Sequence, residues 1–90
     1  MKTAMFQRYE KIKDQHQDEV VLVRLGDFYE AFGKDAEVIA NILDLTLTGR
    51  ICDSETNERI SMAGFPFHVL DRFTAKLAEN NIQVKVVNEL

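Results

Sequence analysis

An aromatic residue and a carboxylate stand two positions apart, directly after a predicted tight turn. Phe28 and Glu30 follow Gly26-Asp27, and the two-residue period of a strand places both side chains on one face. Phe28 could be a core residue paired with Tyr29 and Phe32, or its ring could be an exposed wedge. An exposed ring can enter a DNA duplex from the minor groove where stacking is weak, as at a mispair. The neighbouring carboxylate could then accept a hydrogen bond from the displaced base or, if protonated, donate one.

The residues around this pair predict a hairpin between two helices. Val20–Leu25 is β-branched and mostly apolar, which predicts a buried strand. Gly26 in the first of two turn positions favours a type II′ turn, because glycine tolerates the positive φ needed there. Phe28–Phe32 is then the returning strand. Thr3 could cap a helix of about ten residues before the hairpin, and Asp35–Asp44 predicts a second helix with its first residue as the cap.

The second half of the chain predicts two strands, a helix and a last strand. Leu45–Thr48 alternates and predicts a strand, whereas Gly49–Glu58 is polar and turn-rich, which is typical of a surface loop. Arg59–Ala63 predicts the next strand. Gly64-Phe65-Pro66 interrupts the pattern, and its proline would lie near the first turn of a helix. The apolar stripe of that helix and the last strand consist of Val69, Leu70, Phe73, Leu77 and Val84–Val87.

This order, α-β-β-α-β-β-α-β, predicts an α/β (α+β) fold in which helices pack on one mixed β-sheet. The 90 residues suit one core, and we expect residues 1–90 to form a single domain, since domains usually take about 100 to 150 residues. Apolar residues make up 46% of the chain, which excludes a disordered tail. No apolar run approaches the roughly 18 residues of a membrane span, and no secretory signal opens the chain. We therefore expect a cytoplasmic location and no membrane partner.

The charge balance alone argues against a nucleic-acid partner. There are 11 Lys and Arg against 15 Asp and Glu, which gives a net charge of −4, and no basic patch of the kind that binds phosphates. Acidic residues gather in residues 26–44, where Lys34 is the only basic residue. Asp35, Glu37 and Asp44 lack the spacing of a calcium loop. We expect them to form a solvated face.

No residue pattern supports catalysis. Cys52, His68 and Asp71 could be drawn as a hydrolase trio, but no local motif surrounds them. No helix N-terminus lies just behind the cysteine to lower its pKa. Gly33-Lys34-Asp35 lacks the hydroxyl residue and the upstream glycine of a phosphate-binding loop, and a single cysteine excludes a multi-thiolate metal site. We therefore expect no catalytic site, metal site or cofactor in this chain.

The hairpin and the segments around it resemble a known family. Arg24–Phe32, with the sequence RLGDFYEAF, resembles the mismatch-recognition hairpin of the MutS family of DNA mismatch-repair proteins. The resemblance continues in the same order over essentially the whole chain. The other segments that carry it are Met5–Gln15, Asp35–Thr48, Met62–His68, Ala75–Leu77 and Val84–Val87.

The resemblance implies an N-terminal mismatch-binding domain (domain I) of a larger protein. Its partners would be double-stranded DNA with mispaired or unpaired bases and the other domains of the parent. Phe28 would stack on the mispaired base and Glu30 would hydrogen-bond it. Leu25, at a position where the family often has Met, would pack near the opened site. The ATPase of such a parent, with its ATP and Mg, lies in another domain, and a bacterial parent would be cytoplasmic and associated with the nucleoid.

Two interpretations follow from this resemblance. In the first, the chain discriminates mispairs while other domains supply phosphate affinity, so we expect the isolated 90 residues to be monomeric and to bind DNA weakly. DNA phosphates and burial would raise the pKa of Glu30 and favour its neutral acid. In the second, the same fold is a non-catalytic nucleic-acid or protein docking module of a different enzyme, such as a helicase or methylase. A phosphate-binding-loop ATPase encoded downstream would favour the first interpretation.

Overall fold

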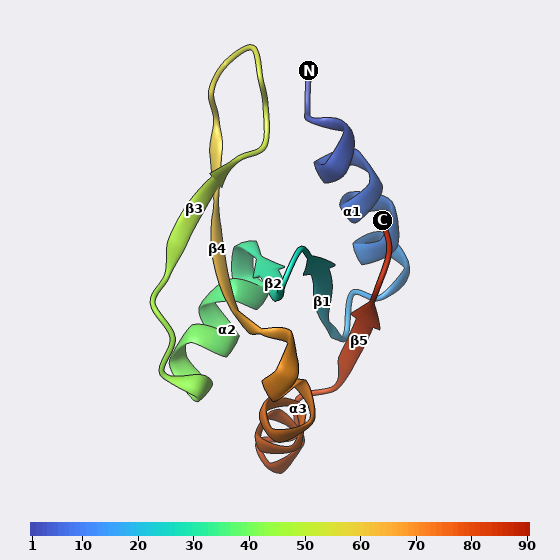
Figure 1. Ribbon diagram of the computed structural model, residues 1–90. Coiled ribbons are helices and arrows are strands. Elements are labelled where there is room, and N and C mark those ends of the chain that lie inside the picture. Colours follow the sequence, from blue (N-terminus) through green and yellow to red (C-terminus); the bar gives the residue numbers. More distant parts are fainter.

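A five-stranded mixed sheet separates one helix from two others in the computed structural model, which describes all residues from Met1 to Leu90 (Figure 1). The strand order is β3-β4-β2-β1-β5, with β1 and β5 parallel and the other neighbours antiparallel. This confirms the predicted fold class and element order. The elements are α1 (Ala4–Gln15), β1 (Val20–Leu25), β2 (Phe28–Phe32), α2 (Gly33–Leu43), β3 (Thr48–Ile51), β4 (Arg59–Pro66), a 3₁₀ turn (Phe67–Val69), α3 (Leu70–Glu79) and β5 (Val84–Val87).

Helix α1 covers part of one face of the sheet. It begins as predicted at Thr3, whose side-chain oxygen accepts a hydrogen bond from the Phe6 amide at 3.2 Å. Phe6 and Tyr9 are buried against Phe32, with ring centres 6.3 and 4.9 Å away. Edge-to-face rings at these distances add to the burial energy of the three side chains. Helix α1 is therefore fixed over the far end of β2.

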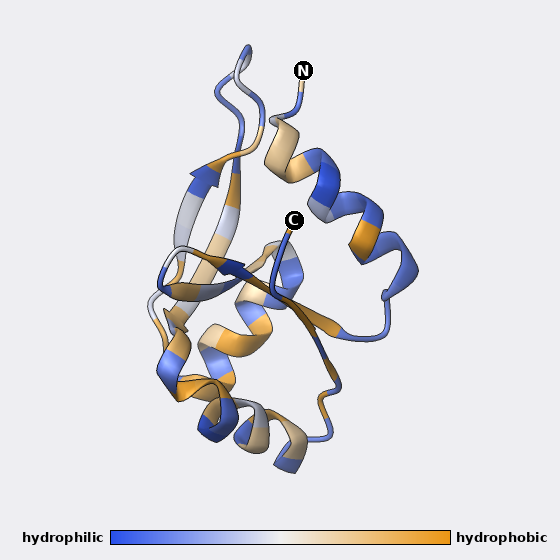
Figure 2. Cartoon of the chain, turned by 45° about the vertical axis from the view of Figure 1, so that its right-hand side comes forward, coloured by the Kyte–Doolittle hydropathy of each residue, from blue (hydrophilic) through white to orange (hydrophobic).

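Helices α2 and α3 cover the opposite face. Alternate residues of the strands, such as Leu22, Ala31 and Phe65, meet Ile39 of α2 and Leu77 of α3 in the larger core cluster. Figure 2 shows the hydrophobic stretches in the strands, whereas the long loop between β3 and β4 is mostly hydrophilic. The longest helix has 12 residues, and none of the helices is long and apolar enough to cross a membrane.

The hairpin of β1 and β2 has the predicted boundaries. Leu25 pairs with Phe28 across a two-residue loop. Gly26 has a φ of +61°, whereas Asp27 is not among the residues with positive φ. A positive φ at the first turn position alone is what a type II′ turn requires. The predicted turn is thus consistent with the structure.

The third strand was predicted three residues too early. Residues 45–47 are not in a strand, and β3 runs over Thr48–Ile51, of which residues 49–51 were predicted as loop. Asp44, the residue after α2, has a φ of +56°, and the amide of Leu45 still donates to the carbonyl of Ala40. Residues 45–47 therefore form the connection from α2 to β3, and pairing with β4 begins only at Thr48.

The fourth strand is longer than predicted. Gly64-Phe65-Pro66 continues β4 instead of interrupting it, and α3 begins only at Leu70 after the 3₁₀ turn. A Cβ atom at Gly64 would lie 2.7 Å from the carbonyl oxygen of Tyr29. Glycine is thus needed here for the close approach of β2 and β4, not for a turn.

The predictions for Asp35 were wrong. Helix α2 begins at Gly33 and has no side-chain cap. Asp35 lies within its first turn and is only 9% exposed. Its carboxylate accepts a hydrogen bond from the Val21 amide at 3.1 Å and pairs with Lys13 Nζ at 2.9 Å. Asp35 therefore holds α1, β1 and α2 together, whereas Glu37 and Asp44 are exposed as predicted.

Candidate functional site

The hairpin brings the three predicted site residues together on one face of the sheet. Leu25 lies opposite Phe28, and Glu30 lies opposite Val23. Alternation along the strands places Leu25, Phe28 and Glu30 on the side that α1 partly covers. Phe28 and Glu30 do not belong to the core cluster beneath α1, and Leu25 only borders it. We call the uncovered part of this side, formed by Phe28, Glu30, Gly64 and Pro66, the open face.

Phe28 is an exposed aromatic residue. Its side chain is 44% exposed, whereas Tyr29 and Phe32 are 5% and 1% exposed. No other ring pairs with it, although Phe32 contacts two aromatic rings of α1. The core interpretation therefore fails for Phe28. Its ring is free to contact a partner, at the cost of hydrophobic surface left in water.

Glu30 is a half-buried carboxyl with an unsatisfied oxygen. Its Oε2 atom is buried and has no hydrogen-bond partner. Gly64 lies opposite it, and a Cβ there would come within 2.9 Å of Glu30 Cγ. Burial raises the pKa of the Glu30 carboxyl, and the nearby positive charge of Arg50 opposes the rise. The surroundings thus shift the carboxyl toward the neutral acid, a form that can donate as well as accept a hydrogen bond.

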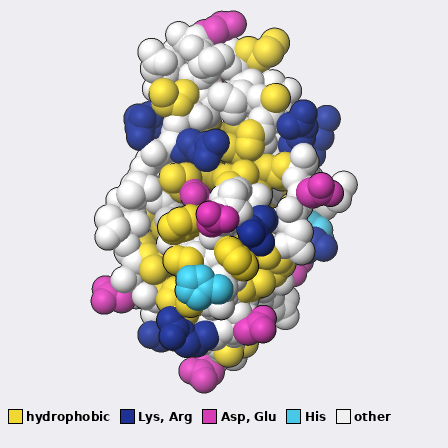
Figure 3. Space-filling view, in the orientation of Figure 1, with side chains coloured by type: hydrophobic (Ala, Val, Ile, Leu, Met, Phe, Trp, Pro, Cys, Tyr) yellow, Lys and Arg dark blue, Asp and Glu magenta, His cyan; other side chains and the backbone are white.

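A second exposed ring lies next to the hairpin. Phe67 is also 44% exposed, and its amide donates to the carbonyl of Asp27 at 2.8 Å. Figure 3 shows hydrophobic side chains across the middle of the molecule, with acidic groups among them and Lys and Arg side chains spread singly around them. No local pattern in the sequence singles out Phe67, because its contact with the turn joins residues 40 positions apart. The same holds for Gly64, whose neighbours lie in β2.

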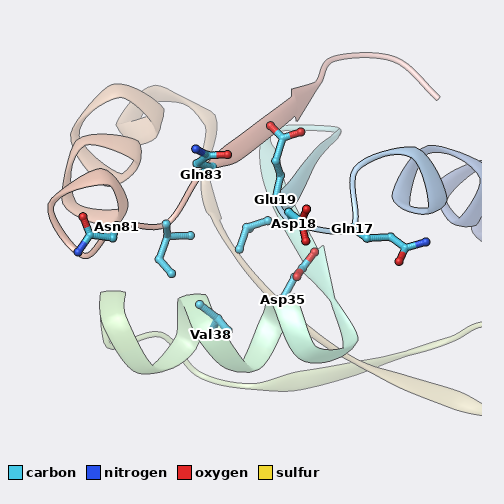
Figure 4. A pocket seen from close by; sticks show the side chains of 9 residues that line it. Gln17, Asp18, Glu19, Asp35, Val38, Asn81 and Gln83 are labelled. Atoms are coloured by element: carbon cyan, nitrogen blue, oxygen red, sulfur yellow. The ribbon is translucent and has the colours of Figure 1, made fainter.

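The one pocket of the structure lies away from the open face. It has a volume of about 230 Å³ and borders the start of β1, whereas Phe28 follows the end of that strand. Figure 4 shows Asp35 and Val38 of α2 facing side chains from the turns before β1 and β5. Asp35 is already paired with Lys13. The lining residues are Gln17, Asp18, Glu19, Val20, Asp35, Val38, Asn81, Ile82 and Gln83.

The structure does not bring Cys52, His68 and Asp71 together. Cys52 precedes the eight-residue strand β4, and His68 follows it. Cys52 is buried, and burial raises the pKa of its thiol, which disfavours a reactive thiolate. His68 and Asp71 are exposed. Cys52 therefore lies apart from His68 and Asp71, which are neighbours at the start of α3.

The comparisons with known proteins agree with the resemblance of the hairpin. A family model described as MutS domain I matches residues 3–90. The DNA mismatch repair protein MutS of Caldanaerobacter subterraneus subsp. tengcongensis is 43% identical over 88 residues, which are 98% of this chain. The protein of the same name from Desulfitobacterium hafniense is 44% identical over all 90 residues, and that of Synechococcus elongatus is 40% identical over 88. The chain spans about a tenth of the length of these relatives.

Proposed function

Because the chain belongs to the MutS family as its domain I, we propose that it recognises mispaired or unpaired bases in double-stranded DNA. Phe28 is the wedge and Glu30 is the hydrogen-bonding partner of the displaced base. The observation that carries the proposal is the exposed Phe28 ring two residues from a half-buried carboxyl with a free oxygen. Leu25, opposite Phe28 in the hairpin, packs beside the opened site.

The wedge discriminates through the cost of unstacking. Inserting a ring between two stacked base pairs costs a few kcal/mol of stacking free energy. This cost is lower at a mispair, because the mispaired bases are already less well stacked and paired. Phe28 has its hydrophobic surface in water before binding, so stacking on a base also removes that surface from water. The same ring therefore gains more at a mispair than at a matched pair.

Glu30 recognises the displaced base as a neutral acid. Burial already raises the pKa of the Glu30 carboxyl in the free chain, and DNA phosphates would raise it further. A protonated carboxyl can donate to a ring nitrogen or carbonyl of a base. Glutamine can also donate at this position and alanine cannot, so Glu30→Gln should retain more of the mismatch preference than Glu30→Ala. An equal preference in the two variants would contradict the role of the proton.

The rest of the activity belongs to a longer protein. The relatives are about ten times as long as this chain, and a net charge of −4 is unsuited to phosphate binding. We propose that other domains of a cytoplasmic parent supply DNA affinity and, with ATP and Mg, the ATPase. This chain supplies the discrimination between matched and mispaired bases.

The experiment compares DNA binding of the longer protein that carries these residues, by fluorescence anisotropy. The duplexes hold a G·T mispair, a single-base bulge or a matched pair. Phe28→Ala should lower the preference for the defect about fivefold or more, because stacking of a base on an aromatic ring contributes about 1–3 kcal/mol. Leu47→Ala is the control, since Leu47 is 45% exposed at another place. An unchanged preference in Phe28→Ala would refute the proposal.

A docking module remains the second candidate. The net charge of −4 and the exposed rings of Phe28 and Phe67 suit a protein partner better than a phosphate backbone. If the wild type itself shows no preference between matched and defective duplexes, the open face serves such a partner in a different enzyme.

A further inference from the structure

Both carbonyl groups of the hairpin turn are held from outside the turn. The carbonyl of Gly26 accepts a hydrogen bond from Arg24 Nε. The carbonyl of Asp27 accepts one from the Phe67 amide at 2.8 Å. A two-residue turn at the end of a hairpin usually leaves such groups to water. Here both are fixed, and Phe28 is the next residue along the chain.

The two residues that hold the turn also contact each other. The guanidinium carbon of Arg24 lies 4.2 Å from the centre of the Phe67 ring, within the range of a cation–π contact. The guanidinium also lies 5.7 Å from the centre of the Tyr29 ring. Arg24 and Phe67 therefore each hydrogen-bond one residue of the turn and also contact each other.

We propose that Arg24 and Phe67 are positioning residues for Phe28, because they lock the turn that precedes it. This inference rests on the proposed function. Phe28 is exposed and has no ring partner, so the backbone before and after it sets the direction in which its Cα–Cβ bond leaves the strand. On the other side of the turn, Phe28 is held in the sheet, where it lies opposite Pro66 of β4. A wedge held in one direction loses less conformational entropy when it inserts.

A positioning role differs measurably from a direct contact of Arg24 with DNA phosphate. A phosphate contact carries no sequence information, so its loss weakens binding to matched and mispaired duplexes equally. Loss of positioning weakens binding to the mispaired duplex alone, since only that complex uses the wedge. The ratio of the two affinities therefore separates the roles.

The test uses Arg24→Met, which keeps the aliphatic stem, and Arg24→Lys, which keeps the charge but not the planar stacked group. Phe67→Leu removes the ring, and Phe67→Tyr keeps it as the matched control. Hydrogen exchange of the backbone amide of residue 67 is measured on the 90-residue chain for each variant. The ratio of mismatch to matched affinity is measured on the longer protein, with Phe28→Ala in parallel.

We expect Arg24→Met, Arg24→Lys and Phe67→Leu each to lower the ratio of mismatch to matched affinity about two- to fivefold. This factor corresponds to the free energy of one exposed cation–π contact. Exchange of the Phe67 amide should quicken by a similar factor, and matched-duplex affinity should stay constant. Phe67→Tyr should behave as the wild type in both measurements.

The inference is overturned if Arg24→Met keeps the wild-type ratio of mismatch to matched affinity. It is also overturned if Arg24→Lys has the wild-type ratio. An equal loss of matched and mismatch affinity overturns it as well. If Phe28→Ala loses the preference while Arg24→Met keeps it, the proposed function stands and only the positioning role fails. If the wild type has no preference, the proposed function fails and this inference fails with it.

Discussion

The surroundings of Glu30 change the chemistry of an ordinary carboxyl group. Its Oε2 atom is removed from water without a protein donor to replace that water. Burying a charged oxygen in this way costs free energy, whereas burying the neutral acid costs less. This burial raises the pKa of the Glu30 carboxyl, and the oxygen without a partner leaves the group free to hydrogen-bond a ligand.

The first prediction concerns the pH dependence of stability. Because the pKa of Glu30 is higher in the folded chain than in the unfolded one, the folded state binds more protons between the two pKa values. The stability that the neutral Glu30 acid contributes is therefore fully present below the pKa of Glu30 in the unfolded chain. It is lost as the pH rises through the pKa of Glu30 in the folded chain. Glu30→Gln should raise the melting temperature at pH 7, and the gain should fade as the pH falls toward about 4.

The control for this prediction is Glu89→Gln. Glu89 is exposed and forms no ion pair, so the substitution should leave the melting temperature nearly unchanged at both pH values. A Glu30→Gln variant that is less stable than the wild type at pH 7 would show that the carboxylate is stabilising there and would contradict the account.

Phe28 illustrates what the sequence alone could not decide. The two-residue period places Phe28 and Phe32 on the same face, and one is exposed whereas the other is buried. The difference comes from α1, whose Phe6 and Tyr9 cover Phe32 but not Phe28. The position of a helix earlier in the chain is a long-range property, so the local pattern left both interpretations open.

Among the elements, Asp35 connects three that are distant in sequence. Asp35→Ala removes the acceptor of the Val21 amide and the partner of Lys13. We expect a loss of about 2–4 kcal/mol in the free energy of unfolding, because the buried Val21 amide loses its acceptor and Lys13 loses its ion-pair partner. Urea unfolding of the chain measures this loss.

Glu37→Ala on the same helix provides the comparison for Asp35→Ala. Glu37 is exposed, and its removal should change stability by no more than about 0.5 kcal/mol. If the two alanine variants unfold at the same urea concentration, the contacts of Asp35 do not stabilise the fold as described.

The strands show which local signals identify an element. The hairpin of β1 and β2 was predicted correctly, because a β-branched run, a glycine turn and an alternating return strand agree with one another. Strand β3 was misplaced since it is an edge strand that carries no alternating pattern. The end of β4 was missed because Gly64 and Pro66 usually interrupt structure, and only the approach of Tyr29 explains the glycine.

The whole molecule presents one closed and one open side of its sheet. Helices α2 and α3 cover one side, and α1 covers only part of the other (Figure 1). The open face carries the exposed Phe28 ring and the half-buried Glu30 carboxyl, on a chain whose net charge is −4. We therefore expect this surface to discriminate between duplexes that another part of a longer protein binds, and to add little affinity of its own.

The charge of the chain therefore predicts weak binding in isolation. With a net charge of −4, the 90 residues should bind matched DNA with a Kd above about 100 μM at physiological salt, the weak end of non-specific binding. Titration of a labelled duplex with the chain measures this value. Micromolar binding to the matched duplex would show that the chain has a phosphate-binding surface of its own.

The central claim is that Phe28 enters the duplex at a mispair. The most direct measurement is the fluorescence of 2-aminopurine placed next to a G·T mispair, bound by the longer protein. The account predicts a change in emission with the wild type and with Leu47→Ala, because insertion alters the stacking of the reporter base. Phe28→Ala should leave the emission at the value of free DNA even at saturating protein. The same emission change in Phe28→Ala as in the wild type would contradict insertion of this ring.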